Sequence, residues 1–172
     1  MTATMTTVSP ELKNYLLESY QRELETTLKI LRAYPAAESE MRPHPTSMSA
    51  RELAWTFVIE QGVCGAALRD ELTMPPDAPP PPADTFDACV AAFEASSKEL
   101  SRLLEATSPS VLAETFEFFV GPKQLGQIRK FDFLQIMLND QIHHRGQLSV
   151  YLRMTGSKVP SIYGPSRDEP WV

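Results

Sequence analysis

The stretch SPELKNYLLESYQRELETTLKILRAYP, residues 9–35, decides the fold class of this 172-residue chain. It opens with Ser9 and Pro10, a pair typical of a helix start, because the Ser hydroxyl can accept from free N–H groups and Pro occupies a position whose N–H has no partner. Leucines then follow at helical spacing until Pro35: Leu12, Leu16, Leu24, Leu28 and Leu31. The pattern predicts a helix over residues 10–34, about 37 Å long and so of bundle length.

A second helix is predicted over residues 50–72. Ser49 with Glu52 three residues later forms a capping-box signature in front of apolar residues at helical spacing. The segment Pro75–Pro82 that follows is dense in proline, which lacks a backbone N–H and cannot continue a helix. We therefore expect a long, stiff, extended crossover between the second and third helices.

Two more helices complete the pattern, the third over residues 84–106 and the fourth over residues 127–155. Residues 107–126 between them break the helical period, and Thr115–Val120 is short and aromatic, as an extended piece would be. The tail, residues 159–166, is too rich in Pro and Gly to be helical. The sequence therefore predicts an all-α protein, a four-helix bundle with an irregular C-terminal tail.

Composition limits the classes of function. The chain has 16 Lys and Arg against 22 Asp and Glu, a formal net charge of -6, whereas a nucleic-acid surface needs clustered basic residues. No apolar run approaches the roughly 20 residues that span a bilayer, and Met1–Val8 is polar, unlike a signal peptide. We therefore expect one cytoplasmic domain over residues 1–172, with small molecules or proteins as partners and neither nucleic acid nor membrane.

Polar residues interrupt the apolar stripes of the second and fourth predicted helices. One face of the fourth helix carries Met137, Asp140, His144, Leu148 and Tyr151. One face of the second carries Leu53, Thr56, Glu60, Cys64 and Ala67. If these two faces meet, four polar side chains come together inside the bundle.

Asp140 and His144, four residues apart, can bind one divalent ion, and Glu60 can complete three ligands and leave an open coordination position. Such a site would be catalytic in type. In the alternative interpretation Asp140 only accepts a hydrogen bond from His144, and Glu60 pairs with an arginine such as Arg145. We expect Arg145 and Gln147 to anchor the fourth helix to a neighbouring helix or to the tail.

The run NDQIHHRGQLSVYLR at residues 139–153, followed by VPSIYGPS at residues 159–166, resembles the C-terminal signature of the DinB (damage-inducible) family. The order of a long first helix, a capped second helix and a late histidine-bearing helix agrees with that family over nearly the whole chain. The resemblance implies a four-helix bundle, often homodimeric. It also implies a divalent metal, nickel or zinc among others, bound by one histidine from the second helix and two from the last at a spacing of four.

Carried over residue by residue, the resemblance places the later histidine of the pair at His144, the earlier one at Asp140, and the histidine of the second helix at or near Thr56. Thr is a poor ligand for zinc or nickel, and a carboxylate in place of an imidazole favours harder ions such as manganese or iron. Glu60, one turn after Thr56, can supply the missing ligand. We therefore expect Asp140, His144 and Glu60 to bind Zn, Ni, Mn or Fe, or no metal at all, with these residues lining the site: Thr56, His143 and Tyr151.

Two functions from different classes follow. The family that this chain resembles includes bacillithiol- or mycothiol-dependent transferases and a maleylpyruvate isomerase. The first function is therefore a metal-assisted, thiol-dependent small-molecule transferase or hydrolase, in which the ion polarises a thiol or water. The second is a non-catalytic, stress-related binding or structural protein that has lost the three-histidine site. In both cases we expect a homodimer.

Overall fold

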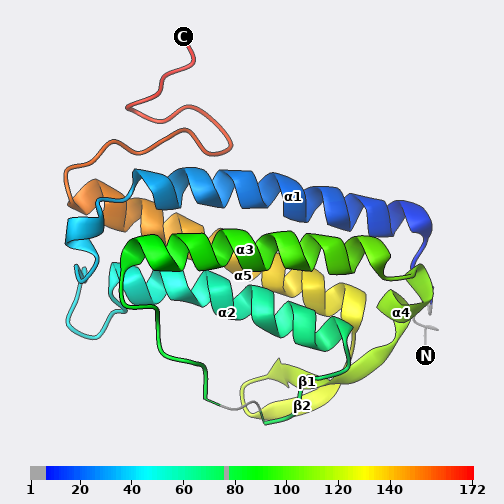
Figure 1. Cartoon of the computed structure of the whole chain (residues 1–172). Helices are drawn as coiled ribbons and strands as arrows, with labels where there is room; N and C mark the ends of the chain where they lie inside the picture. Colours follow the sequence, from blue (N-terminus) through cyan, green and yellow to red (C-terminus); the bar gives the residue numbers. More distant parts are fainter. Residues whose placement is uncertain (1–6, 76–77) are drawn as a thin grey trace.

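Four long helices lie side by side in the computed structural model, which describes residues 7–75 and 78–172 (Figure 1). They are α1 (Pro10–Ala33), α2 (Ala50–Leu68), α3 (Phe86–Ala106) and α5 (Lys130–Met154). Both α1 and α2 pack against α3 and α5. The mostly helical architecture predicted from the sequence is confirmed, and no described helix has the length and apolarity to cross a membrane.

A small antiparallel sheet corrects the all-α prediction. Strand β1 (Thr115–Gly121) pairs with β2 (Gln124–Arg129), and the short helix α4 (Pro109–Ala113) precedes the hairpin. A Cβ on Gly126 would lie 2.9 Å from Cγ2 of Val120, so any other residue at this strand position would force the Val120 side chain to shift. Thr115–Val120 is thus extended as expected.

Several helix ends in the structure differ from those predicted from the sequence. The last long helix begins at Lys130 rather than at residue 127, because the residues before it pair with β1. Helix α2 ends at Leu68 rather than at residue 72, and Asp70 takes a positive φ of 59° just after it. Helix α3 begins at Phe86, capped by the Thr85 hydroxyl, rather than at residue 84.

The two predicted helix caps are present. Ser9 Oγ accepts a hydrogen bond from the Leu12 N–H at 3.2 Å. Ser49 and Glu52 form a complete capping box, because each side chain accepts from the other residue's backbone N–H. These local hydrogen bonds set where α1 and α2 begin.

Neither the crossover nor the tail contains a helix or strand among the described residues. The predicted crossover segment includes residues 76 and 77, which lie outside the described part of the chain. The indole N–H of Trp55 on α2 donates to the carbonyl of Pro80 at 2.9 Å, which attaches the crossover to the helix. The loop between α1 and α2 contains one 3-10 turn, η1 (Ala36–Glu38).

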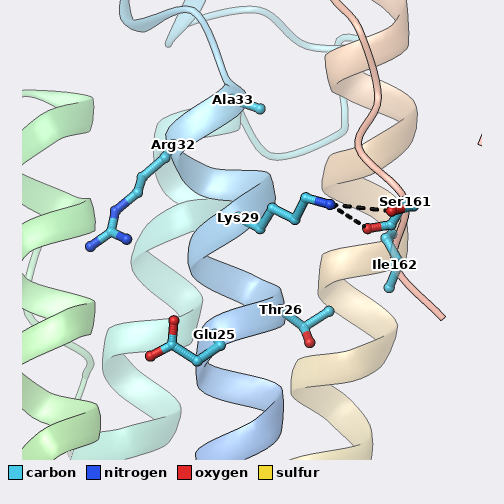
Figure 2. Close-up of a pocket in the computed structure, with 7 residues that line it drawn as sticks. All are labelled: Glu25, Thr26, Lys29, Arg32, Ala33, Ser161 and Ile162. Carbon is cyan, nitrogen blue, oxygen red and sulfur yellow. Dashed lines mark hydrogen bonds between the residues drawn. The ribbon is translucent and has the colours of Figure 1, made fainter. Parts of the chain in front are cut away.

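The tail runs back along α1. Figure 2 shows Lys29 of α1 reaching the tail at Ser161, where its Nζ donates to both the carbonyl and the hydroxyl oxygen. Lys29 also forms an ion pair with Glu169 at 2.9 Å. The shallow pocket of about 690 Å³ between α1 and the tail is therefore crossed by hydrogen bonds between its own lining residues.

The buried side chains form two apolar clusters with a polar layer between them. Each long helix contributes to both clusters. Along each helix, one or two buried polar side chains separate the residues of one cluster from those of the other. The polar layer consists of Glu23 and Thr27 on α1, Glu60 and Gln61 on α2, Ser97 on α3, and Gln141 and Arg145 on α5. The candidate site lies in this layer.

Candidate metal centre

Three of the predicted ligands come together between α2 and α5. Glu60 projects from α2, and Asp140 and His144 project from α5, each with a ligand atom within 4.8 Å of the other two. His144 Nε2 lies 3.5 Å from Glu60 Oε1 and 3.7 Å from Asp140 Oδ1. The cluster therefore holds two carboxylates and one imidazole.

The antiparallel packing of α2 and α5 explains why Glu60, Asp140 and His144 lie close together. Gln61, next to Glu60, donates its amide N–H to Gln141, next to Asp140, at 2.8 Å. Further along α5, the Tyr151 hydroxyl donates to the carbonyl of Met48, just before α2 begins. Since the helices run in opposite directions, Asp140 and His144, one turn apart, both face the turn of α2 that carries Glu60.

Glu60 is the unusual member of the cluster. Its residue is 6 % exposed, and among the described residues neither carboxyl oxygen has a hydrogen-bond partner. Burial, with a smaller contribution from the Asp140 charge, raises the pKa of Glu60 to about 9. A buried carboxylate without hydrogen bonds is costly, so this group requires either a proton or a cation beside it.

The donor set fits a divalent cation. Ligand atoms about 2.1 Å from a tetrahedral ion lie about 3.4 Å apart, close to the two distances from His144 Nε2. Glu60 closes the inner side of the cluster, whereas the Asp140 side chain is 47 % exposed and leaves an open approach from solvent. Carboxylate ligands suit manganese, and imidazole suits iron and zinc. A set of two carboxylates and one imidazole therefore fits manganese, iron or zinc.

The His144 ring has further contacts outside the cluster. Its Nδ1 lies 3.0 Å from Gln147 Oε1, and the Gln147 amide nitrogen lies 3.0 Å from His143 Nε2. Phe57 packs edge-on against the His144 ring, with centroids 6.4 Å apart. Gln147 therefore bonds histidines on its own helix, and the prediction that it anchors α5 to another element is wrong.

The predicted lining residues do not join the cluster of ligand atoms. The Thr56 hydroxyl donates to the carbonyl of Glu52 at 3.2 Å, and Thr56 lines a pocket of about 470 Å³ beside the crossover. Tyr151 is buried in an apolar cluster. His143 is exposed and is linked to His144 through Gln147.

The alternative in which Arg145 pairs with Glu60 is wrong. Arg145 Nη1 donates to Glu23 Oε2 at 2.7 Å and to the Thr27 hydroxyl at 3.1 Å, both on α1. The Tyr163 hydroxyl of the tail also donates to Glu23 Oε2, at 2.7 Å. The prediction that Arg145 anchors the last helix to a neighbouring helix or to the tail is confirmed.

Glu23 belongs to this network but was not predicted from the sequence as a partner of Arg145. A signal was available, because Glu23 lies on the α1 face that carries Leu16, Tyr20 and Thr27, all buried. An acid in such a stripe indicates a buried ion pair. Its tail partner, Tyr163, lies in an irregular segment and has no periodic signal.

The fold defines a class of protein, a mostly helical one whose solved structural neighbours are DinB-like. A crystal structure of a DinB-like protein from Bacillus cereus ATCC 10987 covers 86% of this chain and 95% of its own, with a TM-score of 0.71 and 21% identity. The DinB-like protein YjoA from Bacillus subtilis gives a TM-score of 0.68 with 18% identity, covering 86% of this chain and 97% of its own. These two likenesses concern the fold alone.

The sequence pattern of the DinB family matches residues 5–171, and the chain belongs to the DinB family. The resemblance seen at residues 139–166 is thus confirmed over nearly the full length. Uncharacterized protein YrdA of Bacillus subtilis (strain 168) is 24% identical over 156 residues, which cover 91% of this chain and 90% of YrdA.

Proposed function

We propose that this chain is a metal-dependent enzyme acting on a small molecule, a transferase or hydrolase whose divalent ion is bound by Glu60, Asp140 and His144. One observation carries the proposal: the buried Glu60 carboxylate has no hydrogen-bond partner in the described part of the chain, and it faces an imidazole nitrogen and a second carboxylate. A cation at their centre would replace the proton that Glu60 otherwise keeps at neutral pH.

Each residue has a separate task in this proposal. Glu60 supplies negative charge from the buried side, Asp140 supplies it from the exposed side, and His144 contributes Nε2 between them. When bound, the divalent ion supplies Lewis-acid chemistry that activates a thiol or water. Thiol-dependent transfer is the reaction class that the family resemblance favours.

Metal analysis of protein purified without an affinity tag tests the proposal. We expect about one divalent ion per chain, and Asp140→Ala and His144→Ala should each lose it. Thr56→Ala is a matched control, because Thr56 lies one turn from Glu60 and contributes no atom to the cluster. Wild-type protein that neither retains a metal nor binds added Zn²⁺ or Mn²⁺ would overturn the proposal.

A second candidate is a non-catalytic, stress-related binding or structural protein. Its support is the Thr56 hydroxyl, which is engaged with a backbone carbonyl where the family resemblance places a histidine ligand. In that case Asp140 and His144 form a metal-free pair beside a protonated Glu60. The same metal analysis distinguishes the two candidates, since this one requires metal-free protein.

A homodimer is part of both candidates. Three large apolar side chains of α5, Ile136, Val150 and Met154, are each about half exposed, which supports a contact between copies of the chain. Light scattering after gel filtration should give twice the mass of the 19.3 kDa chain. A monomeric mass at all concentrations tested would remove this part of the proposal.

A further inference from the structure

The Gln147 side chain connects two imidazoles on the same helix. Gln147 Oε1 faces Nδ1 of His144, and its amide nitrogen faces Nε2 of His143, each at 3.0 Å. We propose that Gln147 is a positioning residue: it keeps His144 in the tautomer whose Nε2 is free to bind a cation. The inference rests on the proposed metal site.

The chemistry of the three groups leads to this assignment. A neutral imidazole has one N–H donor and one acceptor nitrogen, and an amide oxygen only accepts. Because Oε1 faces Nδ1, a hydrogen bond between them requires the proton of His144 on Nδ1. The lone pair of Nε2 then points toward the oxygens of Glu60 and Asp140, where a cation would bind.

The other end of the same amide faces His143. With its Nε2 accepting from the Gln147 amide N–H, the amide oxygen is turned toward His144. The opposite orientation would donate to His144 Nδ1 and move the ring proton to Nε2, where it would point at Glu60. That second state is a hydrogen-bonded, metal-free pair, so the amide selects between the two states of the site.

The first experiment compares Gln147→Met with wild type by two readouts. Long-range ¹H–¹⁵N spectra of the metal-free protein at about pH 8, where an ordinary imidazole is neutral, report the tautomer of His144. We expect Nδ1–H in wild type and a shift toward Nε2–H in Gln147→Met. Zn²⁺ affinity, measured by competition with a chelator, should fall about tenfold, the low end for such outer partners because Gln147 is exposed.

Two further variants separate positioning from general damage. Gln135→Met makes the same exchange about three turns earlier on α5 and should leave both readouts unchanged. Gln147→Glu keeps an oxygen acceptor for Nδ1 and should retain the tautomer and the wild-type affinity or better. His143→Ala should lose less Zn²⁺ affinity than Gln147→Met. It removes one partner of the Gln147 amide but leaves the amide oxygen able to accept from His144 Nδ1.

The outcomes are distinct from those of the proposed function. Gln147→Met with the wild-type tautomer and Zn²⁺ affinity would overturn the positioning role, even if the metal site is real. A larger loss in His143→Ala than in Gln147→Met would also overturn it, because His143 would then act directly. Wild-type protein that binds no metal refutes the proposed function instead, whereas the tautomer spectra test Gln147 without any metal present.

Discussion

Two glutamates in the polar layer are equally buried, yet their surroundings differ completely. Glu23 and Glu60 are each 6 % exposed. Glu23 accepts hydrogen bonds from Arg145 and Tyr163, whereas Glu60 has no hydrogen-bond partner among the described residues. The fold thus pairs the Glu23 carboxylate with the Arg145 guanidinium, whereas the Glu60 carboxylate faces the side chains of Asp140 and His144. The first is held in a buried ion pair, and the second needs a proton or a cation beside it.

The largest expected effect comes from removing the cation beside Glu23. Arg145→Met should lower the free energy of unfolding by about 4 kcal/mol, because it leaves a buried carboxylate without its charge partner. Urea unfolding measures this change. Arg102→Met, at an exposed ion pair on α3, is the matched control and should change stability by less than about 1 kcal/mol. Equal losses in the two variants would contradict the structural role of Glu23.

The next effect is a pH dependence that belongs to Glu60 in the metal-free protein. The unfolded chain loses this proton near the ordinary pKa of 4.5, but the folded chain keeps it to about 9. Between these values the folded state binds more protons, so stability falls as pH rises, by roughly 3 kcal/mol from pH 6 to pH 8 for one proton.

Urea unfolding with a chelator present tests this dependence. Glu60→Gln cannot lose the proton, so its stability should vary less between the two pH values than that of wild type. Added Zn²⁺ should bind more tightly at the higher pH, because the ion must displace the proton. If Glu60→Gln keeps the full wild-type slope, another group is responsible.

A smaller effect is expected at the glutamines between the two carboxylates. Gln141 accepts from Gln61 and donates to Thr27, which also accepts from Arg145. Gln141→Leu should cost about 2 kcal/mol, since it leaves the Gln61 amide buried without its acceptor. The double variant with Gln61→Leu should recover part of this loss in thermal unfolding. No recovery would mean that packing, not hydrogen bonding, sets the cost.

The smallest effect is expected at the tail. Tyr163→Phe removes the hydrogen bond that Tyr163 donates to the Glu23 carboxylate and the one that it accepts from Arg145. The Arg145–Glu23 ion pair stays in place, so the change should cost only about 1 kcal/mol. Tyr15→Phe, at a tyrosine that is 60 % exposed, is the control and should be neutral. A loss as large as that of Arg145→Met would show that the tail, and not the ion pair, holds Glu23.

The parts of the fold that sequence could predict are those with local causes. Leucine spacing and two capping serines predict α1 and the start of α2, because each cause lies within one turn of its effect. The hairpin depends on pairing between separate segments, so a helical period was extended too far into β2. Helix α4 did carry a signal: Ser108 before Pro109 repeats the Ser9 and Pro10 start of α1.

The same distinction between local and long-range causes decides which parts of the candidate site could be predicted from the sequence. The four-residue spacing of Asp140 and His144 is local, and the apolar stripe around Glu60 indicates that it faces inward, so their meeting could be predicted. The Gln147 contacts depend on side-chain rotamers on an exposed helix face, where periodicity carries no information. The pairing of Arg145 with Glu23 rather than Glu60 is a choice between two inward carboxylates, which only three-dimensional packing decides.

In the metal site that we propose, the three ligand residues lie far apart along the chain, which has a consequence for biosynthesis. Glu60 emerges from the ribosome well before Asp140 and His144, which lie on the last of the four long helices. Until that helix has been synthesised, a nascent chain can offer an incoming ion no more than one of the three donors. We therefore expect loading to follow translation of α5, so that the occupancy of the finished protein reflects the ions available at that moment.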